Sequence, residues 1–171
     1  MEIKFTTGAS PLGSVLVAAT DKGVCAISLR ESDAGAEEHL RARFPRAEVT
    51  RDDAALKRVL DTVRERIAGR KLDSVFPLDL QGTDFQREVW SQLLSIPPGK
   101  TRSYLDVAQA INRPKATRAV AQACGANPVA VVVPCHRVVM SDGSIGGYSG
   151  PPGVKKALLA AEGVEQATAA N

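Results

Sequence analysis

The hydrophobic pattern of the first part of the chain predicts a small sheet and helices. Short β-prone runs occupy residues 3–5, 13–20 and 24–29, and the turn Asp21-Lys22-Gly23 joins the last two into a hairpin. Residues 36–44 predict a short helix. The first part is therefore expected to contain strands followed by helices.

A second helix of this part has a clearer apolar face. It is predicted over residues 53–68 and ends at Gly69. Its apolar positions are Leu56, Val59, Leu60, Val63 and Ile67. Residues 72–80 are expected to form an extended connection, because Pro77 disfavours a helix or a central strand. We place a domain boundary near residue 80, which divides the chain into residues 1–80 and 81–171.

Helical patterns dominate the second part. Thr83 and Gln86 form a capping-box signature for a helix that ends before Pro97-Pro98-Gly99. A weaker Ser-x-x-Asp cap begins a helix over residues 103–111, and an alanine-rich helix is expected over residues 115–124. Two short helices joined by a three-residue turn suit a helix-turn-helix, although ordinary helix packing produces the same pattern.

The net charge of +3 arises in the second part. Residues 1–80 hold 13 basic and 13 acidic side chains, whereas residues 81–171 hold 9 basic and 6 acidic ones. Residues 99–138 alone contain six basic side chains against one acidic side chain. A local basic surface favours a polyanionic partner, although a solvated face without a partner has the same composition.

The three cysteines and two histidines limit the chemistry that the sequence can hold. The cysteines are too few for a disulfide framework, and the absence of a C-x-x-C pair argues against zinc, so we expect a reducing compartment and no metal. The sequence has neither a long apolar run nor the pattern of a secretory signal, and we expect a cytoplasmic, prokaryote-like protein. Cys25 is expected to be a packing residue and His39 a surface residue, while Cys124 is either packed or lines a pocket.

The third cysteine, Cys135, is the candidate nucleophile. A wholly apolar run over residues 129–133 leads to Pro134, Cys135, His136 and Arg137. A side chain at the end of a buried segment is held rigidly, and nearby basic groups favour the thiolate. Most free cysteines are nevertheless small buried side chains. A direct pair of Cys135 and His136 is also awkward, because adjacent side chains of an extended segment point to opposite faces.

The motif Pro134-Cys135-His136-Arg137-Val138 resembles the active-site signature of the methylated-DNA–protein-cysteine methyltransferases, also called alkylguanine-DNA alkyltransferases. The resemblance is specific over residues 81–163 and loose over residues 1–80. Further motifs in the family's order and spacing are Phe85-Gln86-x-x-Val89-Trp90, Ile96-Pro97-x-Gly99-x-Thr101-x-Ser103-Tyr104, Arg118-Ala119-Val120, Asn127-Pro128, Gly147-Tyr148-Ser149-Gly150 and Lys155-x-x-Leu158-Leu159-x-x-Glu162-Gly163.

The resemblance implies an α+β fold with two domains. A ribonuclease H-like α/β scaffold would occupy residues 1–80, and a mostly helical, winged helix-turn-helix-like catalytic domain would follow. No four-cysteine zinc module precedes these motifs, so the chain resembles the stand-alone form of the family.

The resemblance also implies roles in catalysis. Cys135 would accept the alkyl group, His136 would deprotonate it through a water molecule, and Glu162 would orient the imidazole. Tyr104 would hydrogen-bond the base and help to protonate the departing guanine, and Asn127 would brace the turn before the active-site segment. The plainer alternatives are a packed Tyr104, a surface Glu162 near Lys155 and an Asn127 that is only a turn residue.

Other motif residues would bind the damaged DNA. Arg118 would fill the space left by the flipped nucleotide, or it would be a simple phosphate contact. The backbone N–H of Ser149 would meet the 6-oxygen of guanine, and the carbonyls of Cys135 and Val138 would accept from its amino group. The remaining expected contacts are Ala119, Arg137, Tyr148 and Gly150. Pro151-Pro152 departs from the family pattern and stiffens this loop.

The resemblance therefore implies a single-use DNA repair protein that carries an alkyl group from the 6-oxygen of guanine, or alternatively from the 4-oxygen of methylthymine, to Cys135. The thioether product is not reversed by redox exchange, so one molecule repairs one lesion. The expected partner is double-stranded DNA containing alkylated guanine, bound in the minor groove by a monomer that needs no cofactor. The alternatives are a non-catalytic lesion-binding protein and a helix-turn-helix regulator.

Overall fold

The computed structural model describes residues 1–70 and 76–164, which form two compact units. The first contains Met1–Gln81 together with Pro128–Ala130, and the second contains Gly82–Asn127 and the chain from Val131 onward. Among the described helices, none is long and apolar enough to cross a membrane.

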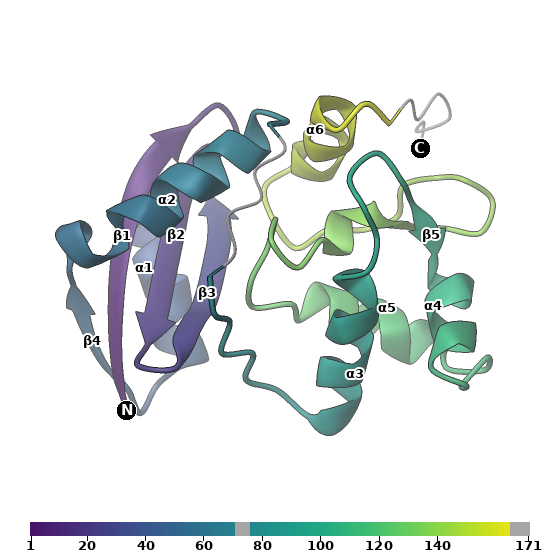
Figure 1. Cartoon of the computed structure of the whole chain (residues 1–171), viewed down its shortest axis with the longest axis horizontal. Helices are drawn as coiled ribbons and strands as arrows, with labels where there is room; N and C mark the ends of the chain where they lie inside the picture. Colours follow the sequence, from purple (N-terminus) through teal and green to yellow (C-terminus); the bar gives the residue numbers. More distant parts are fainter. Residues whose placement is uncertain (71–75, 165–171) are drawn as a thin grey trace. The chain divides into compact units, whose positions relative to one another are not determined.

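The first unit is built on a four-stranded sheet (Figure 1). Strands β1 (Glu2–Ser10), β2 (Gly13–Thr20) and β3 (Gly23–Arg30) are antiparallel neighbours, and β4 (Glu48–Arg51) runs parallel to β1. The strand order is β3-β2-β1-β4. The hairpin predicted from residues 13–20 and 24–29 is confirmed as β2 and β3. Strand β1, which pairs with β2, extends well beyond the expected residues 3–5.

Two helices cover opposite faces of this sheet. Helix α2 (Asp53–Ile67) lies in front of the sheet in Figure 1, and α1 (Asp33–Arg43) lies behind it. Residues 15–18 of β2 are therefore all fully buried, as expected for a strand that is covered on both sides. The α+β class of the chain is confirmed.

The edge of β3 pairs with two distant segments. The backbone N–H of Val24 donates to Pro77 O at 2.8 Å, which confirms an extended connection there; residues 72–75 of the expected connection lie outside the described residues. The N–H of Ile27 donates to Pro128 O at 2.9 Å, and Ala130 N–H returns a bond to Ile27 O at 3.0 Å. The sequence contained no signal for this return of the chain to the first unit.

The second unit is mostly helical. It contains α3 (Asp84–Leu93), α4 (Tyr104–Ala110), α5 (Thr117–Gly125) and α6 (Val154–Ala161). The capping boxes at Thr83 and Ser103 are both confirmed. Helix α5 begins two residues later than expected and has no side-chain cap.

Short pieces of structure connect these helices. Asn112 adopts a left-handed φ of 62° in the turn between α4 and α5, a conformation that asparagine tolerates better than most residues. Strands β5 (Arg102–Ser103) and β6 (Val138–Val139) form a parallel pair, and the 3₁₀ turn η1 (Cys135–Arg137) immediately precedes β6. The indole of Trp90 is fully buried and donates to Ala123 O at 2.8 Å, so it ties α3 to α5.

Replacing Thr83 by Ala is expected to destabilise the second unit by about 1 kcal/mol, because the Gln86 N–H loses the side-chain acceptor that caps α3. Trp90 is the only tryptophan, so its fluorescence during urea unfolding reports on this unit. The control Thr83→Ser keeps the hydroxyl and should stay close to wild type. Equal losses for the Ala and Ser variants would contradict the capping role.

Candidate active site

A pocket of about 320 Å³ opens beside Cys135 in the second unit. Its volume lies within the range of small-molecule sites in proteins. Its walls come from α4, α5, η1 and the loop before α6. The lining residues are Tyr104, Ala121, Cys124, Gly125, Cys135, Gly147, Tyr148 and Ser149.

The local backbone resolves the awkward adjacency of Cys135 and His136. The expectation of an extended segment here is wrong, because Cys135–Arg137 forms a 3₁₀ turn, in which successive side chains point about 120° apart. Cys135 can therefore line the pocket while His136 is completely buried. The two side chains do not have to share one face of a strand.

Asn127 braces the segment that leads to the cysteine. Its amide Nδ2 donates to Val133 O at 2.7 Å, and the Cys135 N–H donates to the same carbonyl at 2.8 Å. The segment also contains Val131 with a φ of 70°, a strained conformation for a β-branched residue. The bonds to Val133 O help to hold this strained approach to the nucleophile in place.

The His136 imidazole is joined to a carboxylate that comes from the end of α6. His136 Nε2 lies 3.0 Å from Glu162 Oε2. Burial alone would raise the pKa of Glu162, but hydrogen bonds and charges from His136 and Arg137 lower it to about 2. An ionised carboxylate only accepts hydrogen bonds, so Nε2 must carry the proton and Nδ1 must present its lone pair.

The Arg137 side chain points into the protein rather than toward the surface. It is buried, Nε donates to Glu162 Oε1 at 2.9 Å, and NH2 donates to Glu162 Oε2 at 2.6 Å. NH1 donates to Ile96 O at 2.6 Å. The guanidinium therefore faces the protein interior, and the expected contact of Arg137 with DNA stays a prediction.

The thiol of Cys135 rests in its neutral form. Burial raises the pKa of Cys135, although a hydrogen bond from Asn127 and the charge of Lys155 oppose the shift. Burial also lowers the pKa of His136, which Glu162 partly offsets. The sequence argument that neighbouring basic groups favour a thiolate thus understated the cost of desolvation. Any reaction through the thiolate would need a base to remove the thiol proton.

Lys155 is a site residue whose individual role the sequence analysis missed. Its Nζ is buried and donates to Val138 O at 2.7 Å, to Gly147 O at 3.2 Å and to the Tyr104 hydroxyl at 3.4 Å. Burial lowers the pKa of Lys155 to about 8 and raises that of Tyr104 to about 12. The available signal was its position, because Lys155 shares a helical stripe with Leu158 and Leu159.

The glycine-rich loop approaches Tyr104 closely. Gly146 has a φ of 74°, and a Cβ atom there would lie 3.1 Å from the Tyr104 hydroxyl. Tyr148 and Ser149 line the pocket as expected, whereas Gly150 and Val138 are not among its lining residues. Arg118 is exposed on α5 and Ala119 is half-buried, so the structure places both outside the pocket.

Both parts of the chain match models of one protein family. The 6-O-methylguanine DNA methyltransferase DNA binding domain matches residues 84–164, and the ribonuclease-like domain of the same methyltransferase matches residues 3–80. The chain belongs to the 6-O-methylguanine DNA methyltransferase family.

Individual members of the methyltransferase family resemble the chain over nearly its whole length. Escherichia coli Ada, a bifunctional transcriptional activator/DNA repair enzyme, is 40% identical over 95% of the chain, which spans only 46% of Ada. A methylated-DNA–protein-cysteine methyltransferase of Mycolicibacterium paratuberculosis is 38% identical over 94% of the chain and 92% of the relative. The structure of Mycobacterium tuberculosis OGT in complex with DNA has a TM-score of 0.79 and 36% identity, covering 95% of this chain and 92% of OGT.

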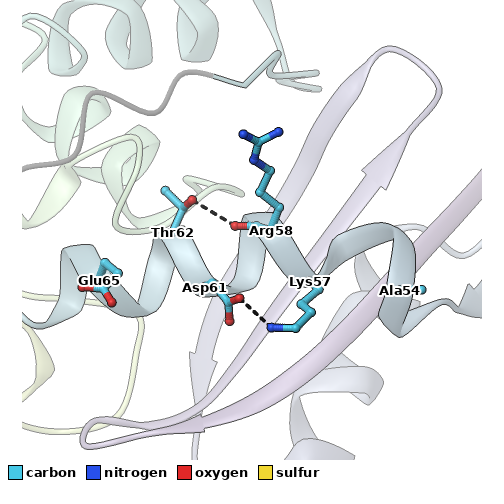
Figure 2. Close-up of a pocket in the computed structure, with 6 residues that line it drawn as sticks. All are labelled: Ala54, Lys57, Arg58, Asp61, Thr62 and Glu65. Atoms are coloured by element: carbon cyan, nitrogen blue, oxygen red, sulfur yellow. Dashed lines mark hydrogen bonds and ion pairs between the residues drawn. The ribbon is translucent and has the colours of Figure 1, made fainter.

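A second hollow, on α2, has no chemistry suited to a methyltransferase. It is larger, about 410 Å³, but a single helix supplies all of its lining residues (Figure 2): Ala54, Lys57, Arg58, Asp61, Thr62 and Glu65. Lys57 pairs with Asp61 at 2.9 Å, and Thr62 donates to Arg58 O at 2.9 Å. These contacts are typical of a solvated helix face.

Replacing Glu162 by Gln is expected to destabilise this methyltransferase-family chain by about 3 kcal/mol or more at pH 7, because the buried Arg137 loses its counter-ion. The native pKa of Glu162 lies below its ordinary value of 4.5, so this stabilisation is complete above pH 4.5 and is lost as the pH falls toward 2. Urea unfolding followed by Trp90 fluorescence should show the difference between wild type and variant shrinking below pH 4.5. A difference independent of pH would contradict the assignment.

Proposed function

We propose that the chain repairs DNA by irreversible transfer of an alkyl group from the 6-oxygen of guanine to the sulfur of Cys135. The observation that carries this proposal is the geometry behind the pocket. A thiol lines the wall, and the next residue is an imidazole whose Nε2 is held by an ionised carboxylate. This arrangement supplies a nucleophile and a base at one end of a cavity.

The base acts through His136 Nδ1. This atom is buried and has no hydrogen-bond partner among residues 1–70 and 76–164. A buried ring nitrogen normally has a hydrogen-bond partner. We infer that a water molecule lies between Nδ1 and the Cys135 sulfur, where it donates to Nδ1 and accepts from the thiol. The thiol proton moves through this water to Nδ1, and the imidazolium that forms is stabilised by Glu162. The thiolate then attacks the alkyl carbon, and the bond from that carbon to the 6-oxygen breaks.

The departing guanine takes its proton from Tyr104, which also lines the pocket. The Tyr104 hydroxyl stays protonated at neutral pH, since its pKa is raised to about 12. The hydroxyl donates its proton to the departing guanine. The Lys155 ammonium, which lies 3.4 Å from the hydroxyl, returns a proton to Tyr104. The thiol proton thus ends on His136, the guanine is neutral, and no cofactor takes part.

Backbone groups near the pocket are suited to recognise the guanine nucleobase. The carbonyl of Val138 accepts one bond from Lys155, and that of Cys135 accepts one from the Val138 N–H. Each carbonyl oxygen has a second lone pair that is suited to the guanine amino group. The backbone N–H of Ser149 at the pocket wall would donate to the 6-oxygen.

The proposed partner is double-stranded DNA, bound in its minor groove by a monomer in the cytoplasm. An alkyl group on a stacked base is out of reach, so the nucleotide must be flipped out at a cost of a few kcal/mol. Arg118 is exposed on α5 and would occupy the vacated space, while the small Ala119 beside it permits close approach to the groove. A binding protein without chemistry would not need the thiol and base at the pocket.

Incubation with an oligonucleotide that contains 6-O-methylguanine should add one methyl group per protein molecule. Peptide mass spectrometry should place it on Cys135, and Cys135→Ser should abolish the gain. Cys124→Ser removes the other thiol of the pocket and should still be methylated. Tight binding without a mass change would instead support a lesion-binding protein, and preference for one undamaged sequence would support a regulator.

Replacing Arg118 by Ala should slow repair of duplex DNA by about tenfold or more, because flipping loses the side chain that fills the gap. The reaction with free 6-O-methylguanine base should change little, since no duplex is opened. Lys115→Ala removes a neighbouring exposed charge and serves as the matched control in single-turnover kinetics. Equal slowing of the duplex and free-base reactions would reject this role of Arg118.

A further inference from the structure

We propose that Arg137 is a positioning residue for alkyl transfer: by holding both carboxylate oxygens of Glu162, it fixes the imidazole tautomer that leaves His136 Nδ1 able to take the thiol proton. This inference rests on the proposed function, because it assigns Arg137 to the base of that reaction. Arg137 touches neither the pocket nor the sulfur, so it acts only through Glu162 and His136.

The geometry fixes the carboxylate at two points. Glu162 Oε1 accepts from Arg137 Nε, while Oε2 accepts from both Arg137 NH2 and His136 Nε2. Two parallel bonds from a guanidinium define the plane of a carboxylate, which a single bond cannot do. The third donation, from NH1 to Ile96 O, anchors the guanidinium itself. The imidazole therefore meets an acceptor of fixed position and direction.

The guanidinium also fixes the protonation state of Glu162. A protonated carboxylic acid could donate to Nε2 of the imidazole. The ring proton would then sit on Nδ1, and His136 could not accept a proton from the thiol. Arg137 opposes this exchange because a buried cation next to the carboxyl group favours the anion. Replacing Arg137 removes this constraint without touching any reacting atom.

The charges around His136 give Arg137 a second effect. Glu162, at the end of α6, favours the imidazolium, whereas Arg137 on η1 and Lys155 on α6 disfavour it. Helix α3 also packs against η1, and its charged residues Asp84, Arg87 and Glu88 are exposed. Loss of the Arg137 charge would thus raise the pKa of His136. At a given acidic pH, a larger fraction of the imidazole would then be protonated and unable to act as a base.

The test compares Arg137→Gln and Arg137→Lys with wild type in single-turnover transfer from a 6-O-methylguanine oligonucleotide over pH 5 to 9. Arg137→Gln should lower the maximal rate on the order of 10- to 100-fold, as expected for a displaced base, and its acidic limb should move to higher pH. Arg137→Lys keeps the charge but cannot make two parallel bonds. It should lower the maximal rate while leaving the acidic limb close to that of wild type.

Nitrogen NMR of the imidazole supplies a readout that does not depend on transfer. His39 is the only other histidine, so His39→Gln assigns the signals. Wild type should show a neutral ring protonated at Nε2 at pH 7.5, and Arg137→Gln should show a mixture of tautomers. Arg87→Gln, which removes an exposed arginine of the same unit, is the control and should match wild type in both measurements. Unfolding followed by Trp90 fluorescence confirms that each variant is folded under the assay conditions.

Two results would overturn the proposal for Arg137, and a third would overturn the proposed function instead. An unchanged tautomer and an unchanged acidic limb in folded Arg137→Gln would overturn the proposal. Weaker DNA binding with a smaller salt dependence and an unchanged pH profile would also overturn it, because this is the signature of a phosphate contact. If wild type accepts no methyl group, the proposed function fails, while the NMR comparison still decides whether Arg137 sets the tautomer.

Discussion

The candidate reactive centre depends on one largely buried carboxylate. Glu162 receives hydrogen bonds from His136 and Arg137, two consecutive residues of the turn that also carries the nucleophile. An anion with little access to water is stable only when donors satisfy it, and these donors supply both bonds and positive charge. The same interactions connect η1 to the end of α6. In the proposed reaction, the reactivity of the sulfur therefore depends on a residue 27 positions further along the chain.

Much of the fold could be predicted because its elements have regular patterns. The hairpin, the apolar face of α2 and the capping box at Thr83 each follow from local residue order. Strand β4 was missed because its four residues are largely polar and exposed. The two-residue strands β5 and β6 have no periodicity to detect, and the pairing of residues 128–130 with β3 depends on contacts across about 100 residues.

The site was less predictable from composition and spacing than from its resemblance to a family. Residue patterns alone indicated a nucleophilic Cys135 but gave no way to place His136, because the 3₁₀ turn has no sequence signal of its own. The resemblance placed Arg137 among the DNA contacts, whereas its side chain is buried beside Glu162. The only sequence signal for Lys155 was its position as a charged residue on an apolar helical stripe. Whether such a side chain reaches inward depends on its tertiary partners.

The neutral resting state of Cys135 has a consequence for a protein that, as we propose, works only once. Peroxides and freely diffusing alkylating agents attack thiolates much faster than thiols. A sulfur kept protonated by its apolar surroundings escapes these side reactions while the pocket is empty. In the proposed reaction, only an alkylated nucleobase that fills the pocket brings carbon and sulfur together long enough for His136 to remove the proton. Burial would thus preserve each molecule for the lesion that we propose it removes.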